Sequence, residues 1–136
     1  MTKLVSLVIL AITIYCPGAG HPNGSSVVGA DWRRNIPLKD GDAACGSRYP
    51  FGTVFVILDD DVEHYVKSRV VTCHDRGSAI GNGNLDLTLM GGKAKLPAAF
   101  AWGKRRREVM VFRNLVEYRR VCAGLKRLGE KAEFCE

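Results

Sequence analysis

Four short runs of strand-forming residues, separated by polar and glycine-rich connections, constrain the fold of this chain most strongly. They occupy residues 52–58, 67–73, 84–89 and 108–113. β-branched and aromatic residues dominate these runs, and the third alternates between apolar and polar side chains. Between the last two runs, "LPAAFAWGK" predicts a short helix with Pro97 in its first turn. This pattern predicts a mainly β fold, a small closed barrel.

The N-terminal end has the pattern of a secretory signal. Lys3 precedes an apolar run from Leu4 to Tyr15, and "CPGAG" follows it. The run is shorter than the roughly 20 apolar residues of a membrane span, and its flanks are those of a cleaved signal peptide. We therefore expect residues 1–20 to be removed, no stable membrane span in the mature form, and a secreted, periplasmic or cell-envelope location. An uncleaved anchor and lipid modification of Cys16 are the alternatives.

The remainder divides into three segments. Residues 21–35 are polar and rich in turn formers, which predicts a flexible linker. Residues 36–113 hold the strand-like runs and form the predicted barrel domain. In residues 114–136 apolar side chains recur at helical spacing with basic residues opposite, so we expect an amphipathic C-terminal helix that packs on the barrel or on a partner. A helix lying on a membrane surface is the alternative. The apolar positions are Leu115, Tyr118, Val121, Cys122, Leu125 and Leu128.

Removal of the signal would leave four cysteines, Cys45, Cys73, Cys122 and Cys135. An even number in an exported chain predicts two disulfides, with three possible connectivities. We favour Cys45–Cys73 and Cys122–Cys135, because the second pair closes a short loop at the chain end. A zinc site with His74 as a ligand is the competing interpretation, but the paired C-x2-C spacing of structural zinc sites is absent. We therefore expect no metal.

The net charge of +6 is concentrated in residues 104–107 and in four residues of the C-terminal segment. Those four are Arg119, Arg120, Lys126 and Arg127. In a cytosolic protein such a cluster would point to nucleic acid, but behind an export signal anionic polymers of a cell envelope are better partners. We expect no nucleic-acid partner. A solvated basic face without a specific ligand is the simplest interpretation.

Three motifs follow one another between Tyr49 and Arg113. They are "PFGTVFVI" (50–57), "DRGSAIGNGNLDL" (75–87) and "AAFAWGKRRREVMVF" (98–112). Together they resemble the three-aspartate (3D) domain, a double-psi β-barrel found in lytic transglycosylase A and in resuscitation-factor-like stationary-phase proteins. Rare-lipoprotein-A-like barrels are a close second, since they share "PFGT", "DRG" and an element like "LDLT". The resemblance implies a six-stranded double-psi barrel that acts on the cell wall.

The chain departs from the 3D pattern on the strand before the shared proline. The third aspartate of that family lies five residues before the proline, and Cys45 stands there in this chain. Asp42 is nearby, but in a different register. The histidine that rare-lipoprotein-A-like proteins carry before the same proline is replaced by Gly46.

The resemblance implies a lytic transglycosylase that cleaves the MurNAc–GlcNAc bond of peptidoglycan and forms 1,6-anhydromuramoyl products. One carboxylic acid first protonates the glycosidic oxygen and then acts as base toward the muramoyl 6-hydroxyl. Asp86, within an apolar strand, is the candidate acid/base. Asp75 is the candidate neighbour whose negative charge raises the pKa of that acid. We expect no cofactor, and a monomer acting on peptidoglycan glycan strands.

Four further residues are candidate substrate contacts: Arg76, Gly77, His74 and Trp102. The glycines at 77, 81 and 83 would permit positive φ in the turn between the two aspartates and leave room for a sugar. Without the resemblance, Asp75-Arg76-Gly77 would be interpreted as a common turn, and Asp86 as a strand aspartate that is hydrogen-bonded to a loop. The alternative function is a non-catalytic expansin- or barwin-like module that binds or loosens wall polysaccharide through Trp102 or the arginines. A structural or host-interaction protein is the third possibility.

Overall fold

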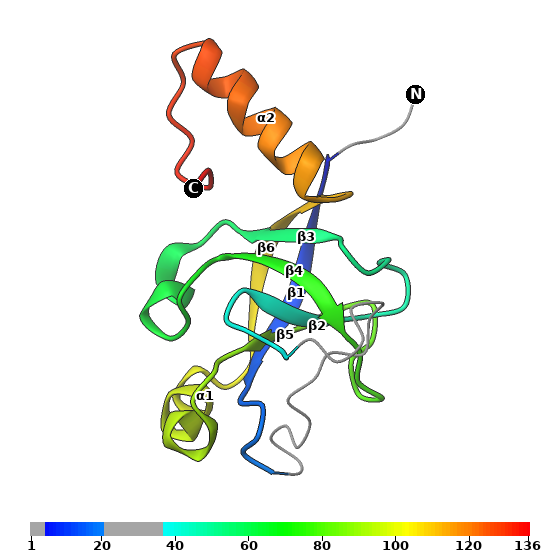
Figure 1. The fold of residues 1–136 in the computed structure, drawn as a ribbon, viewed down its shortest axis with the longest axis vertical. Helices are drawn as coiled ribbons and strands as arrows, with labels where there is room; N and C mark the ends of the chain where they lie inside the picture. Colours follow the sequence, from blue (N-terminus) through cyan, green and yellow to red (C-terminus); the bar gives the residue numbers. More distant parts are fainter. Residues whose placement is uncertain (1–4, 21–36) are drawn as a thin grey trace.

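The computed structural model describes residues 5–20 and 37–136, and the predicted linker over 21–35 lies outside them. Within these ranges the chain forms six strands and two α-helices (Figure 1). The strands are β1 (Val5–Tyr15), β2 (Asp42–Cys45), β3 (Val54–Ile57), β4 (Val70–Asp75), β5 (Asn84–Thr88) and β6 (Arg105–Phe112). The helices are α1 (Leu96–Trp102) and α2 (Leu115–Arg127), with the 3-10 helices η1 (Asp60–His64) and η2 (Gly92–Lys95).

The six strands close into a barrel in the order β1-β5-β2-β4-β3-β6. Two neighbouring pairs are parallel, β1 with β5 and β2 with β4, and the other pairs are antiparallel. The predicted mainly β fold with a closed six-stranded barrel is therefore confirmed, and the two parallel pairs are consistent with a double-psi barrel. Closure leaves none of these six strands at an unpaired edge.

Strand β1 is formed by the segment that its composition assigns to an export signal. It pairs with β6 from Val5 to Ile12 and with β5 from Ala11 to Tyr15. The barrel thus begins at Val5, well before residue 36, where the sequence places the start of the domain. Cleavage after Gly20 stays a prediction, and it would remove one of the six strands from this barrel.

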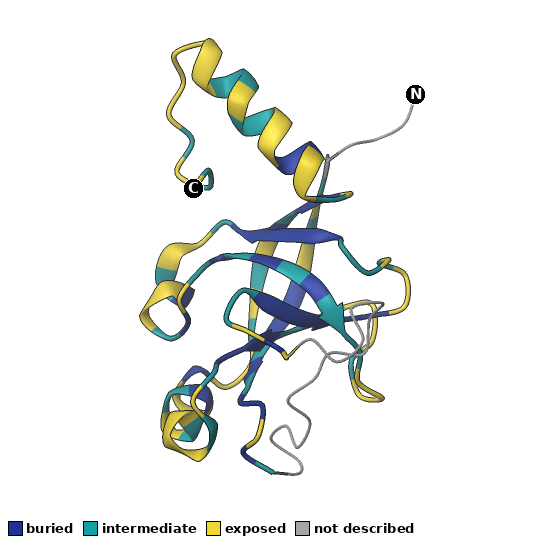
Figure 2. Ribbon diagram, in the orientation of Figure 1, coloured by how far each residue is buried: buried dark blue, intermediate teal, exposed yellow. Residues whose placement is uncertain are grey.

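The barrel interior is filled by side chains that alternate along the strands. From β1 come Leu10, Ile12 and Ile14, and from β5 come Leu85 and Leu87. Strand β3 is buried on both faces (Figure 2). Phe55 and Ile57 lie in the barrel core, whereas Val54 and Val56 lie in the outer cluster with Tyr118 of α2. Burial on both faces explains why β3 reads as an uninterrupted apolar run rather than as an alternating one.

Helix α2 packs on the outer face of the barrel through Tyr118, whose ring lies edge-on to that of Phe112 in a buried cluster that also includes Val54 and Val56. Asn114 caps its first turn by accepting a hydrogen bond from the backbone N–H of Glu117 at 2.9 Å. The predicted C-terminal helix is thus confirmed. Among the described residues, no helix has the length and apolar character needed to cross a bilayer.

Both favoured disulfides are present, Cys45–Cys73 and Cys122–Cys135. The first links β2 to β4 in the barrel wall, and the second ties the chain end to α2. The predicted short helix is also confirmed as α1, with Pro97 in its first turn.

We predict that two isoleucines of β1 differ sharply in their contribution to stability. Ile12 is 0% exposed and Ile9 is 61% exposed, so the pair controls for residue type and strand. Ile12→Ala should lower the free energy of unfolding by about 2–5 kcal/mol because it opens a core cavity. Ile9→Ala should change it by less than about 0.5 kcal/mol. Urea denaturation of the full chain measures both values, and equal midpoints would show that β1 is not part of the fold.

Candidate active site

Asp86 lies on the outer face of the barrel, in the middle of β5. Its neighbours along the strand, Leu85 and Leu87, point into the core, so alternation turns Asp86 outward. Directly opposite it are Thr13 on β1 and Ala44 on β2. The Thr13 hydroxyl donates a hydrogen bond to Oδ1 of Asp86 at 2.8 Å. The candidate acid is therefore held on a rigid strand by a partner from the N-terminal segment.

A β-bulge turns Asp75 to the same face. Strand β2 pairs with β4 through Ala43 and Cys73, but the next residue, Ala44, pairs with Asp75. His74 is thus the extra residue. Without this insertion Asp75 would follow the inward direction of Cys73, because side chains alternate along a strand. Bulges redirect side chains in this way, often beside functional sites.

Ala44 stands between the two aspartates, since it pairs with Asp86 on one side and with Asp75 on the other. The two carboxyl-bearing strands are separated by β2, which places their backbones about 10 Å apart. The methyl group of Ala44 is the smallest side chain that keeps strand geometry. It leaves the space over β2 open for the side chains of both aspartates.

The electrostatics of Asp86 fit an acid that works near neutral pH. Burial raises the pKa of Asp86 to about 6, the hydrogen bond from Thr13 lowers it, and the charge of Asp75 raises it again. The side chain is only partly buried. A carboxyl group of this kind can give a proton and take one back within one reaction.

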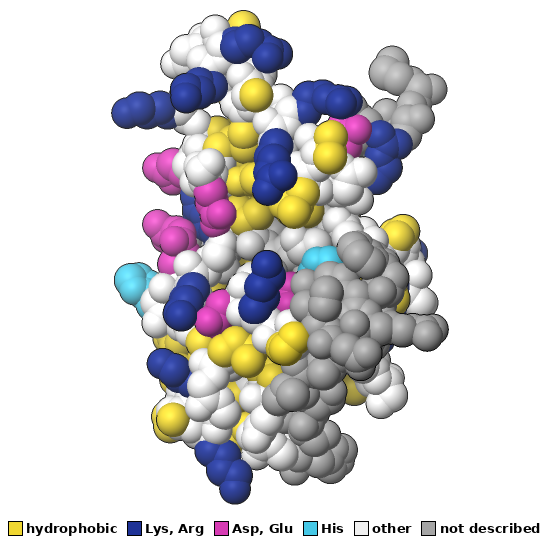
Figure 3. All heavy atoms as spheres, in the orientation of Figure 1, with side chains coloured by type: hydrophobic (Ala, Val, Ile, Leu, Met, Phe, Trp, Pro, Cys, Tyr) yellow, Lys and Arg dark blue, Asp and Glu magenta, His cyan; other side chains and the backbone are white. Residues whose placement is uncertain are grey.

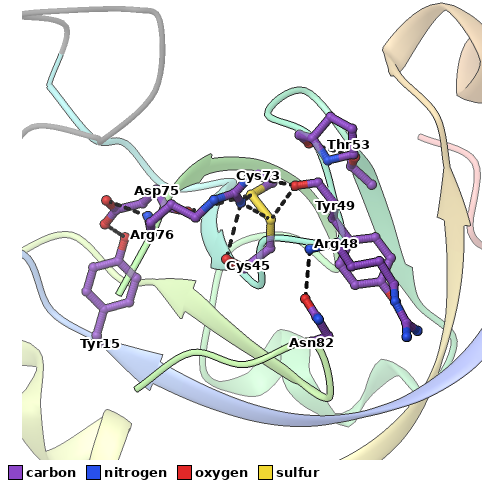
Figure 4. Close-up of a disulfide and its surroundings, with 10 residues drawn as sticks. Tyr15, Cys45, Arg48, Tyr49, Thr53, Cys73, Asp75, Arg76 and Asn82 are labelled. Atoms are coloured by element: carbon purple, nitrogen blue, oxygen red, sulfur yellow. Dashed lines mark hydrogen bonds between the residues drawn. A yellow bond between two sulfur atoms is a disulfide. The ribbon is translucent and has the colours of Figure 1, made fainter. Parts of the chain in front are cut away.

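The side chain of Arg76, a predicted substrate contact, donates hydrogen bonds to other groups of the protein (Figure 4). Its guanidinium donates to the carbonyl oxygens of Cys45 and Tyr49 and to both sulfurs of the Cys45–Cys73 disulfide. It also lies over the Phe51 ring, 4.1 Å from its centroid. This side chain therefore braces the loop that follows β4 against the disulfide.

The glycines between the aspartates do not use the positive φ that glycine would permit there. None of Gly77, Gly81 and Gly83 has a positive φ. Gly77 instead lies at a close approach, because a Cβ there would lie 3.0 Å from Cγ1 of Ile80 and that side chain would have to shift. Gly46 has a stronger requirement, since its Cβ would lie 2.7 Å from the backbone N and Cα of Asn82. The loop packs closely instead of turning through left-handed backbone.

The other two predicted contacts lie in different settings. His74 is partly buried in the bulge of β4, directly before Asp75. Trp102 is 2% exposed, and its Nε1–H donates to the carbonyl oxygen of Ile12 at 2.9 Å. A buried indole offers no face to a glycan, so we assign Trp102 to the core between α1 and β1.

Sequence reasoning missed Thr13, Tyr15 and Ala44. The first two lie in a segment set aside as an export signal, although their polar side chains interrupt its apolar run. Alternation with Ile12 and Ile14 was the signal that could have found them. Asp42, considered as a replacement for the missing third aspartate, is buried at the start of β2 and accepts a hydrogen bond from the backbone N–H of Lys39.

The basic residues divide between partly buried and exposed positions. Arg105 and Arg107 pair with Asp61 of η1, and their guanidinium groups lie near the ring of Trp102. Exposed Lys and Arg side chains are spread over the visible face, and several of them project into solvent at the end of the molecule formed by α2 (Figure 3). No group of three or more potential metal ligands occurs among the described residues.

A scan against protein-family models found no match, and a search of curated proteins found none. Among solved structures, the chain is similar to the E. coli lytic transglycosylase MltA. One MltA crystal structure has 23% identity and a TM-score of 0.47, covering 65% of this chain and 28% of that one. A variant in an apo form has 24% identity and a TM-score of 0.45, covering 62% and 26%. The chain thus spans about a quarter of the length of these similar structures.

We predict that Asp86→Asn stabilises the protein, and only at high pH. The pKa of Asp86 is raised in the fold, so folding binds a proton that the unfolded chain releases above about pH 4. Stability is therefore lost as pH rises from about 4 through the folded pKa of about 6. Asn has no charge to bury and should be more stable than wild type by about 2–3 kcal/mol at pH 8, since one pKa unit corresponds to about 1.4 kcal/mol.

Urea denaturation across this pH range measures the effect. Asp60→Asn is the matched control, because Asp60 is exposed and should shift stability by less than about 0.5 kcal/mol at any pH. A pH-independent difference between wild type and Asp86→Asn would contradict the perturbed titration.

Proposed function

We propose that this protein is a peptidoglycan lytic transglycosylase in which Asp86 is the general acid and base. The observation that carries the proposal is a partly exposed carboxyl group with a pKa raised to about 6, on the same barrel face as a second carboxylate. The resemblance of "DRGSAIGNGNLDL" to the 3D domain supplies the substrate class.

The reaction requires one group that changes protonation state twice. Protonated Asp86 transfers its proton to the glycosidic oxygen, and the bond from this oxygen to C1 of the MurNAc residue breaks. The muramoyl 6-hydroxyl then attacks C1, and the Asp86 carboxylate takes the hydroxyl proton. The products are a free GlcNAc hydroxyl and a 1,6-anhydro ring, no water is consumed, and Asp86 is again protonated.

Thr13 and Asp75 have different tasks in this scheme. Thr13 donates to Oδ1 of Asp86, so the transferable proton is carried by Oδ2. Asp75 contributes negative charge, which raises the pKa of Asp86 and favours the positive charge that develops on the sugar ring. Two carboxylates with different environments thus take two different roles.

We infer an extracytoplasmic location for this enzyme, since two disulfides form and persist mainly in oxidising compartments. Peptidoglycan is the proposed partner. The exposed basic residues of α2 suit the anionic polymers that accompany it in cell envelopes.

We predict that Asp86→Asn abolishes release of soluble fragments from purified peptidoglycan, because the amide cannot act as an acid. Asp75→Asn should lower the rate by about 10- to 100-fold, since it removes only the supporting charge. Mass spectrometry of the soluble products should show 1,6-anhydromuramoyl ends. Asp60→Asn is the control and should retain wild-type rates.

Three outcomes would overturn the proposal. Reducing-end products would show that water is the nucleophile and that the enzyme is a hydrolase. Sedimentation with sacculi without fragment release from wild type would indicate the expansin- or barwin-like binding function. Full activity in Asp86→Asn would remove this residue from the mechanism.

We further predict that the rate of fragment release falls as pH rises above about 6, because the acid form of Asp86 is depleted there. A pH–rate profile with sacculi as substrate measures this limb. A rate that stays constant to pH 8 would contradict the assignment of Asp86 as the acid.

A further inference from the structure

The hydroxyl group of Tyr15 lies between two polar side chains of the candidate site. It donates a hydrogen bond to Oδ2 of Asp75 at 2.9 Å and accepts one from Oγ1 of Thr88 at 3.0 Å. Thr88 is 2% exposed and faces Tyr15 directly across the parallel pair of β1 and β5. Three strands, β5, β1 and β4, are therefore linked by one chain of hydrogen bonds.

The direction of these hydrogen bonds follows from the single proton on the Tyr15 hydroxyl. A tyrosine hydroxyl has one proton, and because Thr88 donates to its oxygen, that proton is directed to Asp75. Burial raises the pKa of Tyr15 well above its ordinary value, and the charge of Asp75 raises it further. Tyr15 thus keeps its proton, and remains a donor, through the neutral and mildly alkaline range.

Asp75 receives a hydrogen bond at each carboxylate oxygen. Oδ2 accepts from Tyr15, and Oδ1 accepts from the backbone N–H of Arg76 at 2.9 Å. The backbone bond is local to the bulge and holds one end of the carboxylate (Figure 4). The bond from Tyr15 comes from another strand and fixes the carboxylate relative to β1 and β5, where Thr13 and Asp86 lie.

We propose that Tyr15 is a positioning residue of the site: its hydroxyl holds the Asp75 carboxylate on the outer barrel face beside Asp86. The inference rests on the proposed function for its catalytic meaning, whereas the geometry itself requires no substrate. Tyr15 lies within the segment assigned to an export signal, so this role requires that β1 remain in the folded enzyme.

Several titratable or charged groups surround this pair. On β1 and directly after it are Tyr15 and the buried thiol of Cys16, whose pKa is raised by burial and by the charge of Asp86. Strand β4 contributes His74, and β2 contributes Asp42. The guanidinium of Arg76 is directed to the disulfide. Tyr15 donates its hydroxyl proton to Oδ2 of Asp75.

The test replaces the tyrosine hydroxyl alone. Tyr15→Phe keeps the ring, and Tyr65→Phe is the matched control, because the Tyr65 hydroxyl accepts from Arg105 at 3.3 Å and has no contact with the aspartates. Thr88→Val is a second variant that keeps Tyr15 and removes its donor. Thermal unfolding establishes that each variant is folded before the site is measured.

Carbon-13 NMR titration of the Asp86 carboxyl group is the main measurement. In Tyr15→Phe the Asp75 carboxylate is held less closely, so the Asp86 midpoint should move down by about half a pH unit, in the same direction as in Asp75→Asn. Thr88→Val should give a smaller shift of the same sign, and Tyr65→Phe no shift. Fragment release should fall about tenfold in Tyr15→Phe while its sedimentation with sacculi is unchanged.

An unchanged Asp86 midpoint in folded Tyr15→Phe, alongside a shifted midpoint in Asp75→Asn, would overturn the inference. An equal shift in Tyr65→Phe would do the same, because the effect would not depend on the bond to Asp75. Inactive wild-type protein would count against the proposed function alone, since the titration needs no substrate.

Discussion

The candidate site depends on the pairing of β1 with β5. This parallel pair closes the barrel and places Thr13 beside Asp86 and Tyr15 beside Thr88. One ladder of backbone hydrogen bonds therefore fixes both the fold and the two side chains that hold the carboxyl groups. Because side chains alternate along a strand, a shift of the β1 register by one residue would turn Thr13 and Tyr15 into the core.

The barrel wall brings the carboxyl groups of Asp75 and Asp86 together, and this proximity is electrostatically unfavourable. Strand β2 separates β5 from β4, and the small side chain of Ala44 together with the bulge at His74 lets Asp75 and Asp86 face the same space. The repulsion between them and the partial burial of Asp86 are unfavourable for the ionised fold. The disulfide Cys45–Cys73 joins β2 to β4 beside the bulge, and Arg76 packs on it. These contacts hold an arrangement that the charges alone would oppose.

Much of the fold could be predicted from the sequence, because β3, β4, β5 and β6 each carry a local signal. Alternation in residues 84–89 and β-branched residues elsewhere reflect side chains that are buried on one face or both. The disulfide Cys122–Cys135, which closes a short loop, and the helix at α1 also followed from local features. Strand β1 did not, since an apolar run in a barrel and the centre of a signal peptide have the same composition. This segment forms a strand because it pairs with β5, some seventy residues away in the chain, where Thr13 donates to Asp86.

The site could be predicted only in part, because it too depends on residues that are distant in the chain. The order of the motifs made Asp75 and Asp86 candidates, but neither the bulge nor the burial of Trp102 can be read from residue types. We claim above all that this fold raises the pKa of Asp86 to about 6, so that a fraction of this carboxyl group stays protonated near neutral pH. Carbon-13 NMR titration of the Asp86 carboxyl group in the wild-type protein tests it most directly. We predict a midpoint of about 6, whereas a midpoint near 4, the value of an unperturbed aspartate, would contradict it.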